Sequence, residues 1–190
     1  RSEVVLVGDN FDESLDSALK FCKKHKLPFI HPFDDPEVIS GQGTIGKEII
    51  EDFQEKIDVI FVAVGGGGLI SGLGAYIKSF NPKIKIVAVE AEDAAGLYKS
   101  LEIGKRIKLD KVGLFADGAA AKQIGLNNYQ LIKEWLDDSI TVSTDEICAA
   151  VKDTFAETRT VPEPTGALAL AGLKKYITKR KIKNKNLIAT

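Results

Sequence analysis

Four consecutive glycines, Gly65 to Gly68, join a strand-like run to a helix-like run, and this junction constrains the fold more than any other feature of the sequence. The preceding run, Asp58–Val64 (DVIFVAV), is apolar and mostly β-branched, as expected of a strand buried on both faces. The following run, Leu69–Phe80, has the apolar pattern of a helix. Glycines leave backbone N–H groups uncovered by side chains, and a helix N-terminus attracts negative charge. The junction therefore predicts an anion site, and phosphate is the usual ligand of such sites.

The local pattern leaves several ligands open. A nucleoside triphosphate is disfavoured, because the P-loop requires Gly-Lys-Ser/Thr where this chain has Gly-Leu-Ile. The dinucleotide fingerprint fits Gly67, Leu69 and Gly72 poorly, since the helix follows too promptly. Glu90 nevertheless ends the next strand about 20 residues on, where a ribose-binding acid is expected, so a dinucleotide stays open. The remaining alternative is a glycine-lined packing contact between strand and helix, with no ligand.

The patterning predicts an α/β fold with three layers and a mostly parallel sheet. Lys85–Val89 is the strand after the glycine-led helix, and the right-handed crossover rule makes it parallel to Asp58–Val64. Further strands are predicted at Glu3–Val7, Pro28–Pro32, Ile140–Val142 and Asn186–Thr190. Further helices are predicted at Phe11–Cys22 with Asn10 as its cap, Gly43–Phe53, Leu97–Leu101, Tyr129–Leu136, Ile147–Phe155 and Gly166–Thr178.

Composition excludes several classes of partner. The formal net charge is −1, so neither a nucleic acid nor a membrane surface is expected as a partner. The longest apolar runs are too short to span a bilayer. Cys22 and Cys148 each occupy an apolar position of a helical pattern, which predicts buried free thiols. Unpaired cysteines indicate a reducing compartment, either the cytoplasm or an organelle matrix.

Both ends of the sequence resemble internal positions of a longer polypeptide. A strand-like run begins almost at once after Arg1, and the chain contains no Met. At the other end, the strand pattern stops at Thr190 with neither a turn nor a cap. We therefore expect an incomplete fold whose missing parts belong to the same polypeptide.

Five blocks, in this order and spacing, carry a resemblance to a known family. They are HPFDDPEVISGQGTIGKEI (His31–Ile49), VGGGGLISG (Val64–Gly72), VEAED (Val89–Asp93), VGLFADG (Val112–Gly118) and EPTGALALAG (Glu163–Gly172). Together they resemble the biosynthetic threonine dehydratases (threonine ammonia-lyases), which are fold-type II enzymes, tryptophan synthase β-like, that depend on pyridoxal 5′-phosphate (PLP). The resemblance covers essentially the whole chain.

The resemblance implies roles for particular residues. In the family the glycine loop holds the PLP phosphate through backbone amides, which assigns cofactor binding to Gly65, Gly66, Gly67, Gly68 and Leu69. It also implies that Asp117, Gly118 and Glu163 form part of the pocket wall. Without the resemblance, Asp117 is a turn residue before glycine and Glu163 flanks a helix N-terminus, and these readings stay open.

The implied reaction is the β-elimination of L-threonine to 2-oxobutanoate and ammonia in isoleucine biosynthesis. The family's Schiff-base lysine lies in a Ser-Phe-Lys-x-Arg motif that this sequence lacks, and Lys78-Ser79-Phe80 has the wrong order. The chain therefore carries no catalytic residue of its own, and we expect it to be inactive alone. Some relatives bind a divalent cation through an acid six positions after Glu90. That position is Gly96, so no metal site is expected.

The resemblance also sets expectations for the wider organisation. Residues 1–33 would end the smaller of two lobes, and residues 34–190 would form part of the larger, PLP-binding lobe. Partners would be an amino-acid substrate, the rest of the polypeptide and further copies, since the family forms tetramers. The family is allosteric, and its regulatory region would follow Thr190. The alternatives are a serine racemase or serine dehydratase of the same fold, and a non-catalytic module that binds a phosphorylated small molecule.

Overall fold

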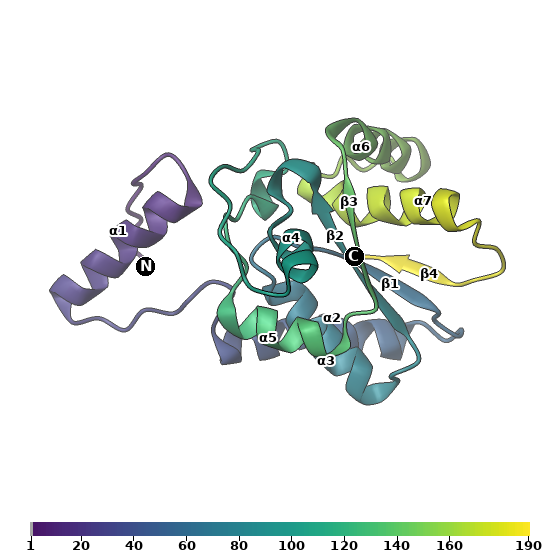
Figure 1. Ribbon diagram of the computed structural model, residues 1–190, viewed down its shortest axis with the longest axis horizontal. Coiled ribbons are helices and arrows are strands. Elements are labelled where there is room, and N and C mark those ends of the chain that lie inside the picture. Colours follow the sequence, from purple (N-terminus) through teal and green to yellow (C-terminus); the bar gives the residue numbers. More distant parts are fainter. Residues whose placement is uncertain (1) are drawn as a thin grey trace.

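A four-stranded parallel sheet lies at the centre of the computed structural model, which describes residues 2–190 (Figure 1). Its strands are β1 (Val59–Ala63), β2 (Lys85–Ala91), β3 (Asp138–Val142) and β4 (Leu187–Ala189), in the order β3-β2-β1-β4. Each neighbouring pair is parallel, with Val59 opposite both Lys85 and Leu187. The carboxyl ends of all four strands therefore lie at one edge of the sheet.

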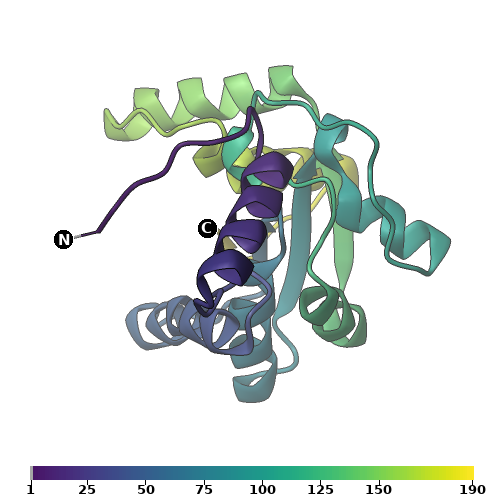
Figure 2. The same ribbon diagram turned by 90° about the vertical axis from the view of Figure 1, so that its left-hand side faces the viewer.

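Within residues 2–190, seven α-helices surround or extend this sheet. They are α1 (Phe11–His25), α2 (Pro36–Asp52), α3 (Gly68–Phe80), α4 (Gly96–Ile103), α5 (Leu126–Trp135), α6 (Thr144–Thr158) and α7 (Leu168–Arg180). Three short 3₁₀ turns are η1 (Glu92–Ala94), η2 (Asp117–Ala119) and η3 (Thr165–Ala167). Helices α2, α3 and α5 lie on one side of the sheet and α6 and α7 on the other (Figure 2). The predicted three-layer α/β fold is confirmed.

Two hydrophobic cores result from the alternation of side chains along the strands. Ile60 and Val62 of β1 face the α3 side, whereas Phe61 points to the α7 side. Phe61 is fully buried and stacks edge-on against Tyr176 of α7, with ring centroids 5.2 Å apart. A strand buried on both faces has to be apolar at every position, which explains the continuous run in β1.

Two predicted strands are wrong. Glu3–Val7 and Pro28–Pro32 are irregular, and Val4, Val5 and Leu6 are exposed. A strand needs a neighbour to bond its backbone, and the described residues provide none near these segments. A β-branched run favours a strand only where another strand lies beside it to pair with.

Several predicted boundaries also shift. Helix α2 begins at Pro36 rather than Gly43, because the Asp35 side chain accepts hydrogen bonds from the amides of Glu37 and Val38 at its N-terminus. The predicted burial of the two thiols is wrong as well. Cys148 is exposed on α6 and Cys22 is only half-buried, although both are free cysteines. In α6 the buried residues are Ile147 and Ala150 rather than Cys148, and α1, which carries Cys22, has no buried residue.

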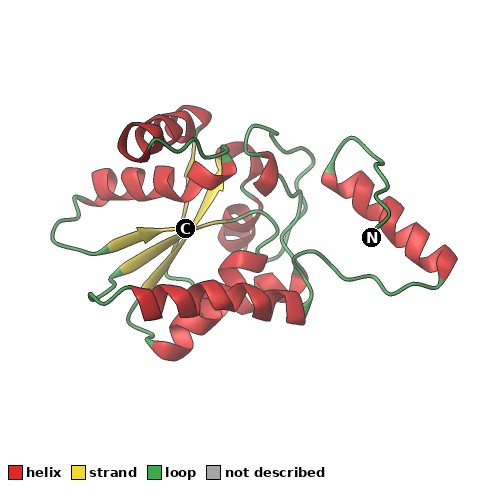
Figure 3. Cartoon of the chain, turned by 180° about the vertical axis from the view of Figure 1, so that it is seen from behind, coloured by secondary structure: helices red, strands yellow, loops and turns green. Residues whose placement is uncertain are grey.

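Helix α1 lies apart from the sheet and its helices. It projects at one end of the long axis of the molecule in two opposite views (Figures 1 and 3). None of its residues is buried, and Leu19 and Phe21 are exposed. Within the described part of the chain, no helix combines the length and the apolar character needed to cross a bilayer.

Candidate functional site

The glycine loop, Gly65–Gly68, leaves β1 at the carboxyl edge of the sheet and runs directly into α3. β2 lies on one side of β1 and β4 on the other, so the order of the strands reverses at this point. In open parallel sheets, ligands bind in the crevice outside such a reversal. The topology therefore places the predicted anion site where the fold favours ligand binding.

Packing alone requires glycine at each position of the loop. A Cβ on Gly65 would lie 2.7 Å from the Cα of Ala119, and one on Gly66 would overlap the ring of Phe33. Gly67 has φ +95°, in the region that favours glycine, and Gly68 lies against the backbone of Phe33. The packing alternative is therefore correct for the side-chain positions, so the presence of glycine is not by itself evidence of a ligand.

The backbone amides of the loop carry the evidence for an anion. Among residues 2–190, no backbone or side-chain acceptor bonds to the amides of Gly65 to Leu69, and the first loop-to-helix bond is from Ser71 to the Gly67 carbonyl. Gly67 and Gly68 are buried, so their N–H groups are poorly placed to bond to bulk water. Buried amides normally have partners. A row of such donors at the N-terminus of a 13-residue helix is suited to a phosphate group.

The structure brings the other predicted site residues to this loop. Ala119, which ends η2, packs against Gly65, and a Cβ on Gly118 would lie 3.0 Å from Thr165 Oγ1 and 3.3 Å from Glu163 Oε1. Asp117 is exposed, and its Oδ1 accepts a hydrogen bond from the Gly118 amide at 3.0 Å. The VGLFADG and EPTG segments thus meet beside the glycine loop, although they are separated by about one quarter of the chain.

Two further residues contact the loop, and a third holds the start of α5 beside it, without having been assigned a role from the sequence. Phe33 packs on Gly66 and Gly68, Asp34 accepts hydrogen bonds from the amides at the start of α5, and Asn128 donates to the Gly66 carbonyl. Phe33 and Asp34 belong to the HPFDDP block, so their motif was a usable signal. No pattern in the sequence distinguishes Asn128 from other polar helix residues.

Glu90 is excluded as a ribose-binding residue by its surroundings. It is fully buried at the end of β2, and its two carboxylate oxygens accept hydrogen bonds from the amides of Leu97 (2.8 Å) and Tyr98 (2.6 Å). Burial raises the pKa of Glu90 to about 7, although bonds from the amides of α4 oppose this shift. Its carboxyl group caps α4 and does not face the glycine loop. Glu90 therefore cannot supply the acidic residue that a dinucleotide site requires.

Lys78, the lysine of the Lys-Ser-Phe string, lies at the opposite edge of the sheet. Its ammonium group donates to Asp137 Oδ2 at 2.6 Å and to the Ile84 carbonyl at 2.8 Å, just before β2 begins. These bonds hold Lys78 near the amino ends of the strands. It is not positioned to react with a ligand at the glycine loop.

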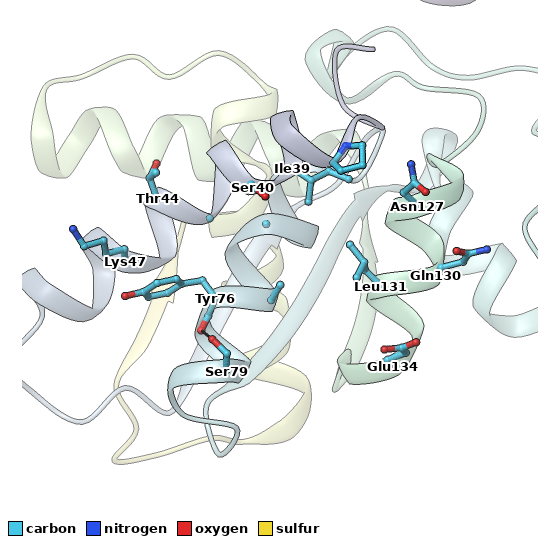
Figure 4. A pocket seen from close by; sticks show the side chains of 14 residues that line it. Ile39, Ser40, Thr44, Lys47, Tyr76, Ser79, Asn127, Gln130, Leu131 and Glu134 are labelled. Carbon is cyan, nitrogen blue, oxygen red and sulfur yellow. Dashed lines mark hydrogen bonds between the residues drawn. The ribbon is translucent and has the colours of Figure 1, made fainter. Parts of the chain in front are cut away.

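A large cavity lies away from the glycine loop. It has a volume of about 770 Å³ and lies between α2, α3 and α5 (Figure 4). Its labelled lining includes Ile39, Ser40, Thr44, Lys47, Tyr76, Ser79, Gln130, Leu131 and Glu134. Over the described residues this lining includes neither the glycine loop nor Asp117, Gly118 or Glu163. The size of a cavity therefore does not identify the anion site in this chain.

Comparison with known proteins identifies a family and similar proteins for this chain. A family model described as "Pyridoxal-phosphate dependent enzyme" matches residues 1–190. The chain is 49% identical over 187 residues to a protein of Burkholderia multivorans named L-threonine dehydratase biosynthetic IlvA. The match covers 98% of this chain but 37% of that relative, so the chain spans little more than a third of its length.

Solved structures similar to this chain include a threonine deaminase and a serine racemase. The processed form of threonine deaminase isoform 2 from Solanum lycopersicum matches with a TM-score of 0.93 and 44% identity, over 97% of this chain and 51% of that one. Maize serine racemase matches with a TM-score of 0.87 and 30% identity, over 98% and 57% of the two chains.

Proposed function

The chain belongs to the pyridoxal-phosphate dependent enzymes, and from this premise we propose that it is part of an enzyme that deaminates L-threonine to 2-oxobutanoate and ammonia. The observation that carries the proposal is the row of unpartnered amides from Gly65 to Leu69 at the carboxyl edge of the sheet. The names of the Burkholderia and tomato relatives support the choice of substrate. The proposed product places the enzyme in isoleucine biosynthesis.

The residues present fit the phosphate group of PLP. A phosphate ester accepts several hydrogen bonds at once, and the loop offers consecutive N–H donors that no described residue uses. No side chain projects from Gly65 to Gly68, so the phosphate can approach the backbone closely. The partial positive charge at the start of α3 favours a dianion at the same place. We propose Gly65, Gly66, Gly67, Gly68 and Leu69 as the phosphate-binding residues.

When bound, PLP supplies an electron sink for the electrons released at the α-carbon of the substrate. The contribution of this chain is to hold and orient that group. The glycine loop is continuous with β1 in the interior of the sheet, so the anchor is attached to a strand that is hydrogen-bonded on both sides. We propose that Asp117, Gly118 and Glu163 form one wall of the pocket beside the loop, where their segments already meet.

The nucleophilic lysine and the general base of the reaction are not assigned to this chain. The Ser-Phe-Lys-x-Arg motif expected for the lysine does not occur in the sequence, and Lys78 is held at the wrong edge of the sheet. We propose that the activity belongs to the whole protein and that these 190 residues alone are inactive. We further propose that residues 1–33 end a smaller lobe and that residues 34–190 contribute to the larger lobe.

The whole protein is proposed to be a homo-oligomer and an allosteric enzyme of a reducing compartment, the cytoplasm or an organelle matrix. The free thiols Cys22 and Cys148 support the choice of compartment. Size-exclusion chromatography with light scattering tests the oligomeric state, and addition of isoleucine to the assay tests the regulation.

The function is tested with the whole protein, supplied with PLP, on L-threonine and L-serine. Formation of 2-oxobutanoate from threonine with a higher kcat/KM than formation of pyruvate from serine supports the proposal. Faster racemisation of serine than deamination of threonine would replace it with a serine racemase. Binding of PLP without turnover of either amino acid would leave a non-catalytic binding module.

A further inference from the structure

Asn128, in the first turn of α5, has no exposed surface and lies against the glycine loop. We propose that Asn128 is a positioning residue that sets the direction of the Gly67 amide before the phosphate binds. The inference rests on the proposed function and adds a residue that acts through the loop rather than on the ligand. It follows from the hydrogen bonds of one side chain and from the planarity of one peptide unit.

The amide nitrogen of Asn128 has two protons and uses both. Nδ2 donates to the carbonyl of Phe33 at 2.7 Å and to the carbonyl of Gly66 at 3.0 Å. Oδ1 has no hydrogen-bond partner among the described residues. Exchange of the two atoms would set an oxygen against two carbonyl oxygens, so the contacts fix the orientation of the side chain. Asn128 thereby joins the HPFDDP segment to the glycine loop.

The Gly66 carbonyl accepts two hydrogen bonds. Besides Asn128, the backbone N–H of Gly125 donates to it at 2.9 Å. A trans peptide is planar, and its C=O and N–H point in opposite directions. The peptide between Gly66 and Gly67 is trans, as are all peptide bonds described. Fixing the Gly66 oxygen towards α5 therefore directs the Gly67 N–H away from α5.

Without these bonds only packing would restrain the rotation of this peptide. Glycine permits many backbone conformations, and Gly67 already adopts φ +95°. A loop of four glycines would lose much conformational entropy on gathering its amides around a phosphate. The bonds from Asn128 and Gly125 impose that loss during folding instead of during binding. Preorganisation of this kind increases affinity without a contact to the ligand.

The N-terminus of α5 is itself firmly attached, so Asn128 is a suitable support. Asp34 accepts hydrogen bonds from the amides of Leu126 (2.8 Å), Asn127 (2.9 Å) and Asn128 (3.3 Å). The Asn127 side chain donates to the Asp34 carbonyl at 2.9 Å and has no hydrogen bond to the glycine loop. Asn127 is therefore a matched control in the same helical turn.

The test compares the affinity of the whole protein for PLP and for pyridoxal, which lacks the phosphate. Dissociation constants are measured by the visible absorbance of the bound ligand for wild type, Asn128→Ala and Asn127→Ala. Loss of one hydrogen bond to the loop is expected to weaken PLP binding about fivefold in Asn128→Ala, with pyridoxal unchanged. Asn127→Ala is expected to keep the wild-type ratio of the two constants.

Each outcome decides a separate point. An equal loss of affinity for both ligands in Asn128→Ala, or no loss, overturns the positioning role while the PLP preference of the wild type keeps the proposed function intact. A wild type without preference for PLP over pyridoxal overturns the phosphate site itself. Asn128→Ser, which retains a small polar side chain, is measured in parallel to replace Asn128→Ala if that variant does not fold by circular dichroism.

Discussion

Glu90 shows how a single residue links burial to pH. Its ordinary pKa is 4.5, and burial raises the pKa to about 7 in the folded chain. Between these values the folded state binds more protons than the unfolded state, so stability falls as pH rises. The contribution of Glu90 to the free energy of unfolding is therefore greatest below about pH 4.5. It falls as the pH rises and becomes constant again above about pH 7.

Glu90→Gln is expected to remove this dependence, because glutamine resembles the protonated acid. The free energy of unfolding of the variant minus that of wild type should increase as pH rises from 4.5 to 7. The full increase is on the order of 3 kcal/mol. Urea unfolding at several pH values measures the difference, in which the titration of other groups cancels. A difference independent of pH would show that the pKa of Glu90 is the same in the folded and unfolded chain, so that burial does not raise it.

The close contact between α2 and α3 requires glycine at Gly72 of α3, whereas Gly41 of α2 has room for a side chain. A Cβ on Gly72 of α3 would overlap the Ile39 carbonyl of α2 and lie 2.7 Å from the Gly43 amide. Both obstacles are backbone, so the helices would have to separate. Gly72→Ala is expected to destabilise the fold by about 3 kcal/mol, measured by urea unfolding.

Gly41 provides the matched control on α2. A Cβ at Gly41 meets nothing within 4 Å, and its φ lies outside the range that favours glycine. Gly41→Ala is expected to stabilise the chain by up to about 1 kcal/mol, because alanine loses less backbone entropy in a helix. Equal effects of the two substitutions would contradict the close approach of α2 and α3.

Helix α5 depends on a cap from a distant segment. Its own N-cap is Gly125, which has no side chain, and the three amides that follow bond to Asp34. Asp34→Ala is expected to destabilise the chain by about 1–2 kcal/mol, because the amides lose an acceptor and the helix dipole loses a negative charge. The measurement is the urea midpoint. Asp110→Ala, at an exposed aspartate with no hydrogen bond among the described residues, should change it little.

His31–Asp34 connects α1 to the much larger unit that the sheet and the other helices form. Helix α1 contributes no buried residue, and its side-chain contacts with the rest of the described chain include the ion pair of Asp12 with Lys108 at 3.6 Å and the tilted packing of Phe11 on Phe33. Removal of residues 1–30 is expected to lower the free energy of unfolding by less than about 1 kcal/mol. Urea unfolding of residues 31–190 tests this, and loss of cooperative unfolding would show that α1 is part of the core.

Prediction from sequence succeeded for elements whose environment is implied by their own pattern. The apolar, mostly β-branched run DVIFVAV predicts a strand covered on both faces, and β1 occupies the interior of the sheet. Prediction was wrong for Glu3–Val7, which has the same β-branched character, because the described residues hold no strand beside it. The burial predicted for Cys148 was wrong for a similar reason, since periodicity identifies a helix face but not what covers it.

The sequence by itself determined the four strands of the sheet, the glycine loop between β1 and α3, and the resemblance to the family, because these depend on patterns and motifs that can be read along the chain. Only the tertiary structure decided that Gly66 is bonded by Asn128 and Gly125, that Asp34 caps α5, and that Glu90 faces α4 rather than a ligand. These contacts join segments brought together by the parallel sheet. Hydrogen bonds depend on distance and direction in space, and neither is encoded in the local pattern of apolar and polar residues.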